Sequence, residues 1–377
     1  MAASESVRHR PAAEAGVFLA TFALIFVAMG ALFAVDLFLA GLERSERRSE
    51  AHQLYMEGLS LSRRRRRAQA VDRFQGAVAA ERGEPVYQRA LASALLAAGK
   101  SAEARAVVAD RLQHEPTDAA ASLIMARILV QQQKPDEAIS YYHRAIYGNW
   151  GDGPPGRRVQ ARFELVDLLA KMGGQRELLG ELLPLEDEAP ADVTTRRRIA
   201  RLFLDAGAPA RSIEILRELL REHGRDADTY AGLGEAELAR GNYRSAAADL
   251  SAAAALAPAD SAIARRLALI QQAIALDPTQ RGLGSDDQYR RSVALLRLTV
   301  QAADSCLGPS SDLAGRALAD TALAAVSSGA GSMRRHDAVE RNIDLAERLW
   351  ALRRKECRGP PTREEQPLAL VLERVAQ

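Results

Sequence analysis

Residues 227–260 read ADTYAGLGEAELARGNYRSAAADLSAAAALAPAD, and this stretch decides the fold. Numbered from its first residue, it has small residues at positions 8 and 20 (Gly234 and Ala246), glycine at position 15 (Gly241) and proline at position 32 (Pro258). Small side chains let two helices approach closely where they cross, glycine accepts the positive φ of a tight turn, and proline ends a helix. The stretch therefore predicts two antiparallel helices, A and B, joined by a turn at the glycine.

The same pattern recurs every 34 residues through residues 51–260. Position 8 is Ala or Gly in five of six units, and position 20 is Ala or Ser in five of six, a registry that is hard to obtain by chance. The departures are a leucine at position 20, two turns without glycine, an arginine at position 27 and a glutamate at position 11: Leu178, Arg65, Gln133, Arg111 and Glu237. The units begin at Ala51, Pro85, Ala119, Val159, Val193 and Ala227, with one six-residue insertion, Gly153 to Arg158.

This pattern resembles the tetratricopeptide repeat (TPR) family at nearly every defining position. The resemblance implies an all-α fold in which about six helical hairpins stack into an α-solenoid, with residues 51–276 as the array and Ser261 to Leu276 as its capping helix. It also implies that other proteins bind in the concave groove, which positions 2, 5, 9 and 12 of helix A line. In this chain those positions include Arg89, Arg127, Gln160, Phe163, Asp167, Arg197, Arg201, Asp228 and Glu235.

The groove residues also bear on the kind of partner. In some relatives a Lys and an Asn clamp a C-terminal carboxylate, but Arg89 and Ser93 occupy those places here. Arg127, Arg197 and Arg201 are expected to form a basic strip suited to an acidic, extended segment of another protein. A solvated groove with no dominant partner is the alternative.

An apolar segment precedes the repeats. Gly16 to Val35 contains 20 residues without a charge, and a helix of that length spans about 30 Å, the thickness of a hydrocarbon core. A cleaved signal peptide has a shorter apolar region, so we expect an uncleaved single-pass transmembrane anchor over residues 16–42. Residues 1–15 are then a tail and residues 43–50 a juxtamembrane linker.

The side of the membrane that holds the repeats is open. Basic residues flank the anchor on both sides, so the positive-inside rule gives a tie. We favour an extracytoplasmic body over a cytoplasmic one. The anchor and repeats together are similar to bacterial envelope TPR proteins, which implies the bacterial inner membrane. One class of those proteins carries a C-terminal zinc module, but the CxxC pairs of that module are absent.

Five consecutive arginines, Arg63, Arg64, Arg65, Arg66 and Arg67, follow the anchor. In the repeat frame they occupy the turn between the helices of the first hairpin. Two interpretations stay open. The run is either a solvated turn, or it contacts the anionic headgroups of the lipid bilayer, where each arginine near the surface contributes about 1 kcal/mol.

Residues after the array do not follow the 34-residue pattern. Residues 277–287 are predicted to form a linker, and residues 288–377 a C-terminal helical region with helices at about 288–306, 312–326, 333–357 and 364–376. This region is either a small helical domain or a set of irregular hairpins. Its two cysteines, Cys306 and Cys357, are either unrelated thiols or a disulfide, and a disulfide requires an oxidising compartment.

No catalytic constellation can be assembled from the sequence. The six histidines are scattered without metal-ligand spacing, so we expect no metal, no cofactor and no small-molecule substrate. A net charge of +2 gives no electrostatic reason to expect nucleic acid. We therefore expect a membrane-tethered adaptor, not an enzyme, that acts in envelope assembly, secretion or quality control. The alternative is an enzyme or enzyme-regulatory subunit whose activity lies in residues 288–377.

Overall fold

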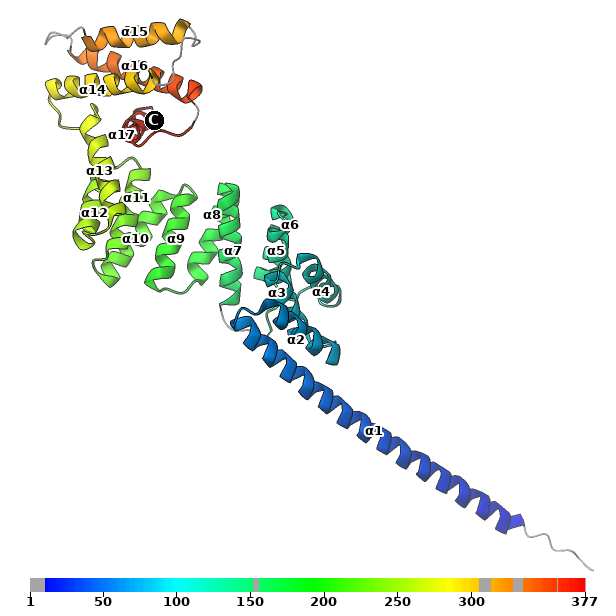
Figure 1. The fold of residues 1–377 in the computed structure, drawn as a ribbon. Coiled ribbons are helices and arrows are strands. Elements are labelled where there is room, and N and C mark those ends of the chain that lie inside the picture. Colours follow the sequence, from blue (N-terminus) through cyan, green and yellow to red (C-terminus); the bar gives the residue numbers. More distant parts are fainter. Residues whose placement is uncertain (1–10, 152–155, 305–312, 328–334, 358, 377) are drawn as a thin grey trace, which may run out of the picture. The chain divides into compact units, whose positions relative to one another are not determined.

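The fold is described from a computed structural model, which describes residues 11–151, 156–304, 313–327, 335–357 and 359–376 (Figure 1). These residues form helices and turns with one isolated β-bridge, between Asp118 and Asn149, and contain no strand. The chain divides into two compact units, Met1–Leu165 and Val166–Gln377. The all-α fold class is confirmed.

The helices follow one another along the chain. They are α1 Pro11–Arg63, α2 Arg67–Ala80, α3 Pro85–Ala97, α4 Ser101–His114, α5 Ala119–Gln131, α6 Pro135–Tyr147, α7 Arg157–Met172, α8 Gln175–Glu188, α9 Val193–Asp205, α10 Pro209–His223, α11 Ala227–Ala239, α12 Tyr243–Leu256, α13 Ser261–Leu276, α14 Ser285–Asp304, α15 Leu313–Ser327, α16 Arg335–Glu356 and α17 Gln366–Val375.

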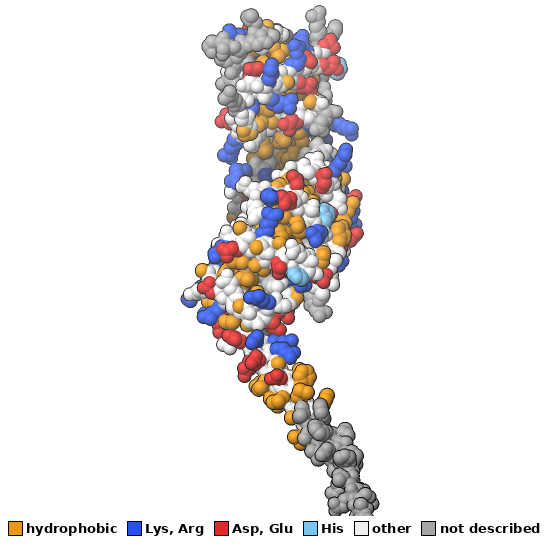
Figure 2. All heavy atoms as spheres, turned by 90° about the vertical axis from the view of Figure 1, so that its right-hand side faces the viewer, with side chains coloured by type: hydrophobic (Ala, Val, Ile, Leu, Met, Phe, Trp, Pro, Cys, Tyr) orange, Lys and Arg blue, Asp and Glu red, His pale blue; other side chains and the backbone are white. Residues whose placement is uncertain are grey.

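Helix α1 joins the apolar segment directly to the first hairpin. Residues 43–50, expected to be a linker, are helical, and the C-terminal part of α1 serves as helix A of the first hairpin. Within Phe26–Arg63, an 18-residue segment has a mean hydropathy of 1.8. None of that segment is buried against the rest of the chain. Figure 2 shows its apolar side chains exposed, followed by acidic and basic side chains nearer the first hairpin. A helix with this length and composition fits either a membrane anchor or a signal sequence.

The backbone at the turns confirms the repeat register. Position 15 of all six units has positive φ, whether or not it is glycine: Arg65 (58°), Gly99 (80°), Gln133 (58°), Gly173 (74°), Gly207 (75°) and Gly241 (76°). Arg65 and Gln133 are the only non-glycine residues with positive φ in the described parts of the chain. The two weakest turns in the sequence pattern therefore adopt the same geometry as the glycine turns.

The crossing of helices A and B explains the small residues. A Cβ atom built on Gly58 would lie 2.6 Å from Phe74 Cε1, and one built on Gly234 would lie 2.7 Å from Leu250 Cγ. Phe74 and Leu250 both occupy position 24, so the large residue of helix B packs directly on position 8 of helix A. The fourth hairpin is the exception, with Leu178 buried at position 20.

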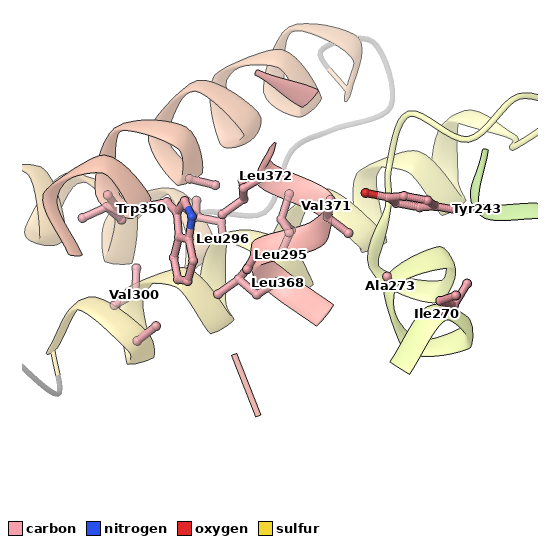
Figure 3. Packing of buried hydrophobic residues seen from close by; sticks show 14 of the residues in the cluster. Tyr243, Ile270, Ala273, Leu295, Leu296, Val300, Trp350, Leu368, Val371 and Leu372 are labelled. Atoms are coloured by element: carbon pink, nitrogen blue, oxygen red, sulfur yellow. The ribbon is translucent and has the colours of Figure 1, made fainter. Parts of the chain in front are cut away.

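The C-terminal helices continue the core of the second unit. One cluster of buried residues includes Ile270 of α13, Leu296 of α14, Trp350 of α16 and Val371 of α17 (Figure 3). Helices α14 to α17 therefore share a hydrophobic core with the last array helices. The expected capping helix is present as α13, but α17 packs against it and covers the end of the array.

Polar contacts hold α17 in place. The hydroxyl of Tyr243 on α12 donates a hydrogen bond to the carbonyl of Leu370 at 2.5 Å. Arg374 donates to Asp277, whose side chain is fully buried at the start of the segment predicted as a linker. The segment is thus anchored at its first residue.

Only one of the two cysteines, Cys357, lies within the described residues. Cys357 is disulfide-bonded. Cys306 lies outside the described residues.

Candidate protein-binding site

In the first unit, the predicted groove residues lie on successive A helices and form ion pairs. Arg89 of α3 donates to Asp118 at 3.0 Å. Arg127 of α5 contacts Glu164 of α7 through two hydrogen bonds of 2.8 and 2.6 Å. Gln160 also donates to Glu164, at 3.3 Å, and Phe163 is half-buried on the same helix.

In the second unit, the predicted residues form a denser set of ion pairs. Asp167 of α7 accepts from Arg198 of α9 at 2.6 Å. Arg197 of α9 is shared by Asp226 at 3.0 Å and Asp228 at 2.7 Å. Arg201 pairs with Asp205 of its own helix and with Glu235 of α11, and Glu235 also pairs with Arg266 of α13 at 2.5 Å.

These pairs change the expected electrostatics of the groove. Arg127, Arg197 and Arg201 each contact at least one carboxylate of the following hairpin. The carboxylates compensate the charge of the expected basic strip, and an acidic partner would have to compete with them. The sequence pattern does not reveal this pairing because it depends on the lateral offset between hairpins.

Two of the carboxylates have a second role as helix N-caps. Asp118 accepts from the backbone of Ala121 at the start of α5, and Asp226 accepts from Thr229 at the start of α11. Burial alone would raise the pKa of Asp118, but the hydrogen bonds from Ala121, Arg111 and Arg89 outweigh burial and hold it below its usual value. The pKa of Asp226 is likewise lowered, because its bonds to Thr229 and the charge of Arg197 outweigh burial. Both carboxylates are therefore ionised at neutral pH.

A pocket of about 380 Å³ opens between α9, α11 and α13. Seven charged residues line the pocket. Four of them are predicted groove residues, and three were not predicted from the sequence. The predicted ones are Arg197, Arg201, Asp228 and Glu235, and the added ones are Arg198, Asp260 and Arg266. The sequence did not indicate Asp260 and Arg266, because α13 was expected to be a capping helix outside the groove. In the structure α13 lines the pocket as a helix A would, and its Arg266 pairs with Glu235 of α11.

The uncharged part of the pocket lining is mostly apolar. Leu204, Leu216, Ala231 and Ile263 line it together with Gly232 and Ser212. Ser212 on α10 is 1% exposed, and its buried hydroxyl has no hydrogen-bond partner in the structure. Serine at position 20, where four of the six units have alanine, was the sequence signal for this feature.

The arginine run lies at the turn between α1 and α2, as expected. All five side chains, Arg63 to Arg67, are exposed, and none of these described residues forms an ion pair. Because α1 is one helix, Arg63 lies about 30 Å along the axis from Leu42, where the predicted anchor ends. That distance exceeds the Debye length of about 8 Å at physiological ionic strength. Contact with headgroups therefore requires α1 to tilt strongly.

Comparison with known families identifies the repeats. Two tetratricopeptide repeat models match, one over residues 95–163 and the other over residues 55–115 and 197–261. No curated protein matches the chain significantly.

Solved structures of TPR proteins also resemble the chain. The C-terminal part of a TPR repeat-containing protein from Cytophaga hutchinsonii has a TM-score of 0.48 at 11% identity, over 65% of this chain and 95% of that one. PilW, a type IV pilus biogenesis factor, has a TM-score of 0.43 at 16% identity over 59% and 98%. YrrB, a TPR protein with an unusual peptide-binding site, has 0.41 at 16% over 51% and 95%. Likeness at this level carries no argument about partners.

The assignment rests on the family models, the 34-residue period and the six turns with positive φ. This architecture is typical of protein-interaction scaffolds. Residues 55–163 and 197–261 of this chain are tetratricopeptide repeats.

Proposed function

We propose that this chain is a membrane-tethered scaffold that binds other proteins on the surface formed by its A helices. The observation that carries the proposal is the pocket between α9, α11 and α13, which is lined by both apolar and charged side chains. Pockets with a few placed polar groups in an apolar surround are typical binding sites. The TPR architecture supports a protein as the partner, because extended segments of other chains fit such surfaces.

Site-specific photo-crosslinking tests the binding surface. A photoreactive residue replaces Leu204, which lines the pocket, and in a matched variant it replaces Leu183, which is 57% exposed on helix B of the fourth hairpin. Both positions are leucines of the second unit. We expect protein crosslinks from position 204 and few from position 183 in cells. Equal crosslinking from both positions, or crosslinks from 183 alone, would contradict the proposal.

The apolar part of α1 is proposed to tether the mature protein. Exposure of Leu24, Phe26 and Phe33 in the structure supports contact with lipid rather than with the rest of the chain. Alkaline carbonate should leave the protein in the membrane pellet, and the intact mass of the mature chain should include residues 16–42. A soluble protein that has lost these residues would show that the segment is a cleaved signal sequence.

We further propose an extracytoplasmic body, in the bacterial envelope, and a role in envelope assembly, secretion or quality control. The disulfide at Cys357 supports this orientation, because structural disulfides persist in oxidising compartments. The arginine run, Arg63 to Arg67, is an additional candidate for lipid contact if α1 is tilted. No observation in the described part of residues 288–377 favours the enzymatic alternative.

A further inference from the structure

A second pocket lies where three separate segments of the second unit meet. It has a volume of about 270 Å³ and is open to solvent. Its lining comes from the turn between α11 and α12 with the first residues of α12, from residues 279–281, and from Arg374 of α17. It shares no lining residue with the pocket between α9, α11 and α13, so it is a separate site.

All charged residues of this lining are arginines. Arg244, Arg281 and Arg374 line the pocket, and no described aspartate or glutamate does. Arg244 donates from Nε to Gln280 Oε1 at 3.2 Å and from Nη2 to the carbonyl of Arg281 at 2.6 Å, so both of these acceptors are uncharged. Neither Arg244 nor Arg281 forms an ion pair with a described residue. Their two charges are therefore not compensated within the described parts of the chain.

Arg374 is held in place, but its donors are not all satisfied. It donates to Asp277 and Thr279, and its Cζ lies 5.5 Å from the ring centre of Tyr243. Figure 3 shows Tyr243 with its hydroxyl directed toward α17, where it bonds to the carbonyl of Leu370. The Nε of Arg374 is buried and has no hydrogen-bond partner in the structure. A buried donor without an acceptor is unfavourable, and an oxyanion in contact with Arg374 would reduce that cost.

Two carboxylates lie near the pocket without lining it. Asp277 is fully buried and pairs with Arg374. Burial raises the pKa of Tyr243 to about 12, and the charges of Asp277 and Glu373 add to this rise against the opposing charge of Arg374. Glu373 is therefore close to the same tyrosine. Three arginines against these two carboxylates leave a net charge of +1, so the site is positive even when its nearest carboxylates are counted.

The start of α12 adds backbone donors at the same place. Its N-cap residue, Asn242, makes no side-chain capping bond and donates instead to Glu237 at 2.7 Å. The N–H groups of Arg244 and Ser245 in the first turn therefore have no capping acceptor. The positive end of the helix dipole thus points at the arginine-lined pocket.

The uncapped start recurs in the other B helices, but their surroundings differ. Helices α4, α6 and α8 carry an acidic residue in the first turn, and α12 carries none. Helices α2 and α10 also carry none. The arginines at α2 belong to one exposed turn, and Arg211 of α10 pairs with Glu186 and Glu214. What distinguishes α12 is that two other segments bring arginines to its first turn.

We propose that this pocket binds the phosphate group of a small soluble molecule between α12, residues 279–281 and α17. Guanidinium groups pair well with phosphate oxygens, and a helix N-terminus favours an anion. A phosphate carries more charge than a carboxylate and offers three acceptor oxygens to the three arginines. The pocket volume exceeds the roughly 30 Å³ of one water molecule several-fold, which leaves room for a small group attached to the phosphate. The site is assigned to binding and not to turnover, because no described lining residue is a carboxylate or histidine that could act as a general base.

Isothermal titration calorimetry with the full chain in an uncharged detergent tests the proposal. The probes are glycerol phosphate, inorganic phosphate and lactate, a small carboxylate, in chloride buffer at equal ionic strength. We expect glycerol phosphate to bind about tenfold more tightly than lactate, as an additional hydrogen bond between charged groups would give. Equal binding of glycerol phosphate and lactate, or no binding of either phosphate up to millimolar concentration, would overturn the assignment.

A further arm of the titration distinguishes a soluble phosphate from a lipid headgroup. Short-chain phosphatidic acid presents the same phosphate group together with acyl chains. We expect it to bind no more tightly than glycerol phosphate. If it binds more tightly, and loses this binding in Arg281→Gln, the source is a lipid headgroup and the soluble ligand is wrong.

Four variants test the residues of the site. Arg244→Gln and Arg281→Gln each remove a guanidinium without an ion pair, and each should weaken glycerol phosphate binding about tenfold. Ser245→Asp places a carboxylate in the first turn of α12, which favours the helix and should block the anion. Arg225→Gln is the matched control, because Arg225 is exposed in the turn before α11 and forms no ion pair with a described residue. Circular dichroism checks folding. Unchanged binding in folded Arg244→Gln and Arg281→Gln, or an equal loss in Arg225→Gln, would overturn the proposal.

Hydrogen exchange locates the bound phosphate. A ligand that contacts all three segments should slow exchange at the start of α12 and in α17, which Tyr243 and Arg374 already connect to the array. Exchange around the pocket between α9, α11 and α13 should not change. Protection there, or at the turn of Arg63 to Arg67, without protection of α17 would place the anion elsewhere and overturn the proposal.

Discussion

The packing at position 8 of helix A can be tested with two glycine substitutions in the second unit. Gly234 and Gly180 both lie inside helices, α11 and α8. A Cβ atom at Gly234 would lie 2.7 Å from Leu250 Cγ and 3.2 Å from the carbonyl oxygen of Ala246, whereas a Cβ atom at Gly180 would meet nothing within 4 Å. Alanine at either site gains the same intrinsic helix propensity, so the difference between the two variants measures the crossing contact.

Two contributions to the free energy of unfolding have known magnitudes, the helix propensity of alanine and the cost of overpacking. Replacing glycine by alanine inside a helix stabilises by about 0.8–1 kcal/mol. Overpacking a tight contact costs about 1–3 kcal/mol, and here the backbone oxygen of Ala246 limits relaxation. We therefore expect Gly180→Ala to stabilise the second unit by up to about 1 kcal/mol, and Gly234→Ala to be about 1–3 kcal/mol less stable than Gly180→Ala.

Urea unfolding of the full chain in detergent, followed by circular dichroism, measures both variants under one set of conditions. Because stacked repeats can unfold in stages, hydrogen exchange of α11 and α12 provides a local readout beside the global one. If Gly234→Ala is as stable as Gly180→Ala, helices A and B do not approach at position 8, and the assigned crossing is wrong.

Further predictions concern a turn, a capping carboxylate and the cysteines. Gln133→Gly should stabilise the third hairpin by about 1 kcal/mol, because φ of 58° strains a residue with a Cβ atom; no gain in thermal unfolding would contradict the turn geometry. The lowered pKa of Asp118 contributes stability above about pH 4, the ordinary carboxyl range, and this stability is lost as the pH falls through the folded-state value. Asp118→Asn should therefore destabilise the first unit at pH 7 by about 1–3 kcal/mol and flatten its acid-induced loss of stability; unchanged acid unfolding would refute the role of its ion pairs. A maleimide reagent should label the denatured protein only after reduction, and labelling of Cys357 without reductant would remove the support for an oxidising compartment.

The fold could be predicted from the sequence because each repeat position has a local cause. The residue types at positions 8, 15 and 20 are limited by steric contacts within one hairpin, so they can be recognised in the sequence of any single unit. The register even predicted the turns at Arg65 and Gln133, where the preferred residue is absent and the backbone is nevertheless at positive φ. The C-terminal region lacked such a period, and the sequence therefore could not decide that α14 to α17 share the core of α11 to α13.

Glu237 shows where local rules fail. The repeat pattern calls for an apolar residue at position 11, and this glutamate is 1% exposed. Arg217 of α10 donates to it at 2.6 Å, and Asn242 donates to it at 2.7 Å. A buried carboxylate is tolerated only when such donors satisfy it. The donors come from a neighbouring hairpin and a turn, so their meeting could not be inferred from position 11 alone.

The same limit applies to the candidate site. The sequence placed Arg197 and Arg201 on an A helix, but it could not show that α11 supplies their carboxylates. The ion pairs between Arg197 and Asp226 and between Arg201 and Glu235 join consecutive hairpins. They depend on the offset between neighbouring hairpins, and no single unit of the sequence encodes that offset.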